Sequence, residues 1–164
     1  MTGEQLVVIG LLAVAFAAGW LARGGHDDQA DEHGDLGPLL DRGGEALERA
    51  LTACHATVAM WRAGEGAGQP AGTMAVRILI DERLRLGAVA DDVRDSLGSG
   101  NPLAVDLAQA AEAASLVERE MEGYLAGDQL DDERGRRLDA YEGAFRDARM
   151  RFGRESEVAR ALTA

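Results

Sequence analysis

The densest group of potential metal ligands in this chain lies between positions 26 and 33. It combines two histidines with four carboxylates: His26, Asp27, Asp28, Asp31, Glu32 and His33. Imidazole and carboxylate groups together can bind a divalent cation. A metal site also needs a rigid frame that orients its ligands, whereas glycines flank this stretch on both sides. We therefore interpret it as a solvated spacer and predict no metal site.

Cys54 and His55 are the next pair of residue types that could do chemistry. A nucleophile and its base must lie within hydrogen-bond reach of each other. Neighbours in a helix point about 100° apart, and Cys54 falls on the apolar face of its segment. We interpret Cys54 as a buried, inert thiol and His55 as a surface side chain. As the only cysteine, Cys54 can form no intrachain disulfide, which agrees with a reducing compartment.

Two further signatures of chemistry are incomplete. Residues 64–72 (GEGAGQPAG) resemble a phosphate-binding loop in glycine content, but no strand precedes them and no Gly-Lys-Ser/Thr follows. A di-iron bundle needs Glu-x-x-His on two helices, and Thr52 stands three residues before His55. All 17 basic residues are Arg, which excludes a Schiff-base lysine. The sequence therefore predicts no enzyme, with no catalytic residue, cofactor or metal ligand.

Four segments with helical periodicity would have to position any site. Apolar residues recur every three or four positions over about 38–63, 73–97, 102–126 and 131–163. The shared face of the first segment carries Leu40, Leu47, Leu51, Cys54, Val58 and Trp61. That of the second carries Val76, Leu79, Leu86, Val89, Val93 and Leu97. Ile78 and Ile80 widen this second face. Thr73 is the expected N-cap of the second segment.

The third and fourth segments have clearer starts. Asn101 is a good N-cap with Pro102 in the first turn, and Asp131 or Asp132 suits the positive start of the fourth helix. The third face carries Leu103, Leu107, Ala110, Ala114, Val117, Met121 and Tyr124. The fourth carries Leu138, Tyr141, Phe145, Ala148, Phe152, Ala159 and Leu162. Glu155 is the polar exception in the fourth rhythm. An ion pair with an inward arginine from another helix is one explanation, but we expect Glu155 where the helix extends beyond the bundle into water.

These segments predict an all-α chain. Short connections favour antiparallel neighbours, so residues 38–164 should form an up-down bundle of four helices. Small residues in the third helix facing aromatic residues in the fourth would interdigitate in its core. Long hairpins that dimerise through the same faces are an alternative that the sequence leaves open.

An uncharged run of eighteen residues precedes the bundle at positions 5–22. As a helix it would span about 27 Å, close to the roughly 30 Å hydrocarbon core of a bilayer. A cleaved signal peptide needs basic residues at its start, and Glu4 has the wrong sign. A core helix would need a polar face, which this run lacks. We predict a single transmembrane anchor over residues 1–23 and an acidic flexible tether over 24–37.

The distribution of charge predicts how the chain is oriented in the membrane and which partners it can bind. Arg23, directly after the apolar run, is the first basic residue and places the C-terminal domain in the cytoplasm under the positive-inside rule. The net charge of −12 argues against nucleic acid, which binds basic surfaces. The expected partners are therefore the lipid bilayer, through residues 5–22, and another protein or a second copy of the chain.

The expected function is that of a membrane-anchored, non-enzymatic interaction or scaffold module at the inner membrane of a bacterium. The bacterial source is inferred from the abundance of Ala, Gly and Arg, which is typical of a GC-rich genome. The alternative is an extracytoplasmic four-helix sensor or ligand-binding domain with reversed topology. The side of the membrane on which the bundle lies separates the two.

Overall fold

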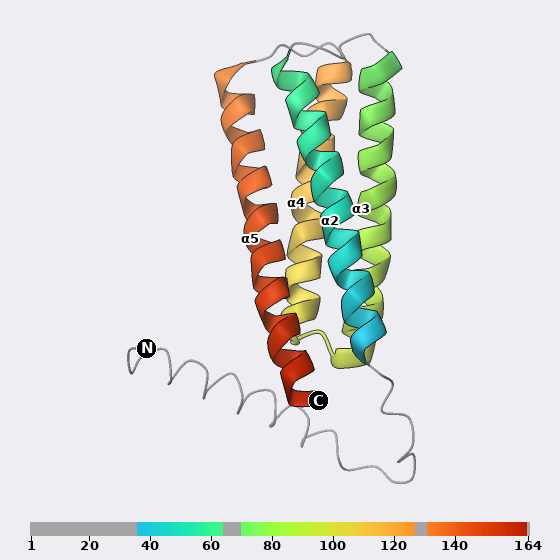
Figure 1. The fold of residues 1–164 in the computed structure, drawn as a ribbon. Coiled ribbons are helices and arrows are strands. Elements are labelled where there is room, and N and C mark those ends of the chain that lie inside the picture. The colour runs from blue at the N-terminus through green and yellow to red at the C-terminus, as the bar shows by residue number, and fades with distance from the viewer. Residues whose placement is uncertain (1–35, 64–69, 127–130, 164) are drawn as a thin grey trace, which may run out of the picture. The chain divides into compact units, whose positions relative to one another are not determined.

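The computed structural model describes residues 36–63, 70–126 and 131–163. Nearly all of them are helical, in four helices: α2 (Leu36–Arg62), α3 (Pro70–Leu97), α4 (Pro102–Leu125) and α5 (Asp132–Thr163) (Figure 1). The predicted transmembrane anchor and most of the predicted tether lie outside these residues. Within them, no helix contains an apolar stretch long enough to cross a bilayer.

The four helices form one antiparallel up-down bundle. α2 packs against α3 and α5, and α4 packs against the same two helices. α2 also meets α4 across one diagonal, whereas the described residues of α3 and α5 make no contact across the other. The start of α2, the α3–α4 turn and the end of α5 lie at the same end (Figure 1). The predicted four-helix bundle is thus confirmed within a single chain.

The predicted capping residues are present at the starts of α4 and α5, whereas the start of α3 differs from the prediction. Asn101 caps α4, because its Oδ1 accepts a hydrogen bond from the backbone N–H of Leu103 at 3.0 Å. Asp131 Oδ1 accepts from the backbone N–H of Arg134 at 2.6 Å at the start of α5. The prediction that Thr73 caps the second helix is wrong. α3 begins three residues earlier, at Pro70, whose fixed φ suits the first turn of a helix.

The apolar rhythm correctly identified most of the core. All seven predicted positions of α4 are buried, as are Phe145, Phe152 and Leu138 in α5. Leu162 and Ile78 are the exceptions, since they are 63% and 48% exposed, and their assignment to the inner faces of α5 and α3 is wrong. α5 has 32 residues against 24 in α4, so its last turn has fewer helices around it.

Candidate functional site

Cys54 and His55 point in different directions in α2. Cys54 is completely buried, and burial raises the pKa of its thiol to about 12, with a smaller contribution from the charge of Glu142. His55 has a half-exposed side chain that reaches toward α5. A thiol with so high a pKa carries almost no thiolate at neutral pH, so this pair does not form a nucleophile and its base.

Sequence reasoning missed a buried carboxylate, Glu142 in α5, which is only 2% exposed. Its Oε1 lies 2.7 Å from Nε2 of His55, and its Oε2 lies 3.3 Å from Nη2 of Arg146 and 3.6 Å from Nη2 of Arg62. Two guanidinium groups and an imidazole therefore surround one carboxylate between α2 and α5. Its spacing from Leu138 and Phe145, four and three residues away, places it on the core face and could have revealed it.

His55 lies between Glu142 and a second residue of α5. Nη2 of Arg146 lies 3.1 Å from Nε2 of His55, the same nitrogen that lies 2.7 Å from Oε1 of Glu142. The group joins α2 to α5 because the guanidinium groups of Arg62 and Arg146 attract the carboxylate of Glu142.

A second buried carboxylate, Asp106, lies between α4 and α5. Its Oδ1 accepts a hydrogen bond from Nε of Arg151 at 2.7 Å, and Nη2 of Arg151 donates to Oε1 of Gln109 at 2.5 Å. Three buried oxygens nearby in α4 and α5 accept or donate no hydrogen bond: Asp106 Oδ2, Glu155 Oε2 and Ser156 Oγ. Burial raises the pKa of Glu155, and the charge of Asp106 raises it further.

The expectation that Glu155 lies in water past the end of the bundle is therefore wrong. Its carboxylate is partly buried against α4, where Asp106 is its neighbour. Two carboxylates supply too few ligands for a metal centre, and the Arg151 guanidinium already binds one of them. No group of three or more metal-ligating side chains occurs among the described residues. The predicted spacer with His26 and His33 lies outside those residues.

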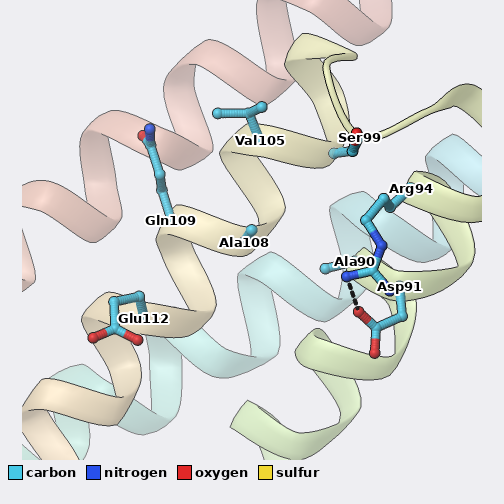
Figure 2. Close-up of a pocket in the computed structure, with 9 residues that line it drawn as sticks. Ala90, Asp91, Arg94, Ser99, Val105, Ala108, Gln109 and Glu112 are labelled. Carbon is cyan, nitrogen blue, oxygen red and sulfur yellow. Dashed lines mark ion pairs between the residues drawn. The ribbon is translucent and has the colours of Figure 1, made fainter.

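A hollow of about 330 Å³ lies between α3 and α4. Its apolar wall is formed by Ala90, Ala104, Val105 and Ala108. Arg94 at its edge binds Asp91 at 3.0 Å, while Gln109 and Glu112 point away from this ion pair (Figure 2). The volume is in the range of small-molecule sites, but the polar groups do not converge on a common point.

The outer face of α3 carries large apolar side chains that turn away from the core. We call the residues Met74, Arg77, Ile78, Asp81, Leu84 and Arg85 the α3 outer stripe. Met74, Ile78 and Leu84 are 58%, 48% and 55% exposed, while Val76, Leu79 and Leu86 on the opposite side are buried. The outer face of α3 therefore mixes three large exposed apolar side chains with three charged ones, although a helix at the surface of a monomer usually has a polar outer face.

Comparisons with known proteins do not identify the chain. No protein-family model, no curated protein and no solved structure matches it.

Proposed function

We propose that this chain is a membrane-held, non-enzymatic interaction module that presents the α3 outer stripe to a protein partner. The observation that carries the proposal is the exposure of Met74, Ile78 and Leu84 on one helix face. Burial of such side chains against a partner removes apolar surface from water, which is the main favourable contribution to most protein association.

The sequence before the bundle supports the membrane part of the proposal. Residues 5–22 carry no charge and have the length of a bilayer-spanning helix. Arg23 at the end of this run favours a cytoplasmic bundle. A module of this kind works by position, because the anchor holds its binding face close to the membrane.

A topology measurement tests this proposal. Fused after Ala164, a reporter that folds only in the cytoplasm should be active, and one that needs an oxidising compartment should be inactive. A control chain with Glu4→Arg and Arg23→Gln moves the positive charge to the other side of the run and should reverse both results. Deletion of residues 5–22 should release the chain from the membrane fraction. Retention of the deleted chain would contradict the anchor.

The hollow between α3 and α4 favours a second candidate function, an extracytoplasmic ligand-binding domain. Its volume fits a small apolar molecule against Ala104, Val105 and Ala108. This function requires the opposite topology, so the same pair of reporters decides between the two candidates.

A further inference from the structure

We propose that the partner of the α3 outer stripe is the same stripe of a second copy, packed antiparallel about a two-fold axis. This inference rests on the proposed role of α3 as the binding face. It does not depend on the anchor or on the side of the membrane where the bundle lies.

The order of residues along the stripe is self-complementary. Met74 and Leu84 are equally far from residue 79, and so are Arg77 and Asp81. A two-fold axis at the level of residue 79 therefore places Arg77 opposite the partner's Asp81, and Met74 opposite the partner's Leu84. Each of these contacts occurs twice, as an isologous interface requires. These two pairings cover four of the six stripe residues, while Ile78 lies at the level of the partner's Ile80 and Arg85 at that of the partner's Thr73.

A parallel pair of stripes would be unfavourable. It would bring each residue against its own copy, so that Arg77 would face a second Arg77 and Asp81 a second Asp81. Like charges that face each other across an interface are destabilising and select against that arrangement. The charges therefore favour one direction of packing, in the way that charged positions select the partners of coiled coils.

The charges of Arg77 and Asp81 are available for a partner. Glu82 and Arg83, their neighbours in α3, form ion pairs with Arg49 and Glu118 inside the bundle. Arg77 and Asp81 form no ion pair with any residue of the described chain, although they are one helical turn apart and both exposed. A contact with a second copy would use them without breaking an existing pair.

The size of the stripe indicates a weak dimer. From residue 74 to 85 a helix is about 18 Å long, and one helix pair of this length gives an interface at or below the lower end of the usual areas. Attachment of both copies to one membrane would raise their effective concentration. The expected association is therefore concentration-dependent in detergent and stronger in the bilayer.

Charge reversal tests the proposal in the full chain in detergent, with the dissociation constant measured by analytical ultracentrifugation. Arg77→Asp and Asp81→Arg should each weaken the dimer by about tenfold or more, since each places like charges opposite each other. The double variant R77D/D81R exchanges the charges and should restore the dimer. Arg119→Asp in α4 reverses an exposed charge outside the stripe and is the matched control. Circular dichroism of each variant checks that the bundle is folded.

Disulfide cross-linking tests the direction of packing. A mixture of the single variants Met74→Cys and Leu84→Cys should cross-link one variant to the other, because the axis brings these positions together. Cys54 is buried and should not interfere. Cross-links of Met74→Cys to itself would overturn the antiparallel arrangement. A monomer at all concentrations, or a dimer that is insensitive to both charge reversals, would overturn the interface. A photoreactive residue at position 78 tests the occupant in native membranes, and a cross-link to a different protein would exclude the second copy while the proposed function stands.

Discussion

Two adjacent glycines in α2 have opposite surroundings. A Cβ atom at Gly43 would lie 2.6 Å from Cζ of Phe152, whereas a Cβ at Gly44 would meet no atom within 4 Å. Gly43 therefore lets α2 approach α5 closely enough for the Phe152 ring to fill the space between them. Gly44 fulfils no such need and only adds conformational freedom to the unfolded chain.

Alanine at these two positions should change stability in opposite directions. Gly43→Ala should lower the free energy of unfolding by about 1–3 kcal/mol, because the methyl group overpacks the contact with Phe152. Gly44→Ala should raise it by about 0.5–1 kcal/mol, because alanine favours the helix and has room. Urea denaturation measures both. Equal effects of the two substitutions would contradict the close approach of α2 and α5.

Glu142 is a buried charge whose desolvation is offset by the basic groups around it. The carboxylate is surrounded by Arg62, Arg146 and His55, and the two guanidinium groups compensate its negative charge. Removal of the cations and removal of the carboxylate should therefore have very different effects on the free energy of unfolding.

The double variant R62A/R146A should lose about 3–5 kcal/mol of stability, because it leaves a buried carboxylate with only His55 nearby. Glu142→Met removes the buried charge itself and should be nearly neutral or stabilising. Arg149→Ala, which breaks an exposed pair with Glu48, is the control and should cost less than about 1 kcal/mol. If Glu142→Met were strongly destabilised, the carboxylate would contribute to stability beyond neutralising the positive charges of its neighbours.

At the scale of elements, two glutamates at the α4–α5 contact respond to pH in opposite ways. Glu120 in α4 binds Arg137 at 2.6 Å and Arg134 at 3.0 Å, and these hydrogen bonds lower its pKa while raising that of Arg137. Burial and the charge of Asp106 raise the pKa of Glu155 in α5. One glutamate favours its ionised form in the folded state, and the other favours its protonated form.

These shifts predict the pH dependence of two matched variants. A lowered folded-state pKa gives stability that is present at neutral pH and lost in acid, so Glu120→Gln should be less stable than the wild type at pH 7. A raised folded-state pKa gives stability that is present in acid and lost as the pH rises, so Glu155→Gln should be more stable at pH 7. Both differences should shrink as the pH falls below the ordinary range of a glutamate pKa. Thermal unfolding from about pH 2 to 8 measures both differences in stability, and the same sign for both variants at pH 7 would contradict the assignment.

At the scale of the whole molecule, apolar periodicity was sufficient to predict four helices and most of the core. It failed at the start of α3, because the glycine-rich run before Thr73 hid a helix that begins at Pro70. It also missed Glu142 and Asp106, whose burial depends on arginines from distant parts of the chain. A single sequence cannot show which cation will meet a given carboxylate.

The α3 outer stripe is a second feature that the apolar periodicity could not predict. Ile78 was expected to widen the inner face of its helix, yet it is 48% exposed on the opposite side. The rhythm of α3 permits either orientation, and packing against α2 and α4 selects one. Only the folded bundle reveals that Met74, Ile78 and Leu84 share a surface with the unpaired Arg77 and Asp81.

Photocross-linking in native membranes tests the central claim most directly. A photoreactive residue at position 78 of the full chain should give a membrane-bound adduct of twice the mass of the chain. The same residue at Met150, an equally exposed apolar position in α5, should give none. Equal adducts from both positions, or recovery of the chain in the soluble fraction, would contradict a membrane-held module that binds through α3.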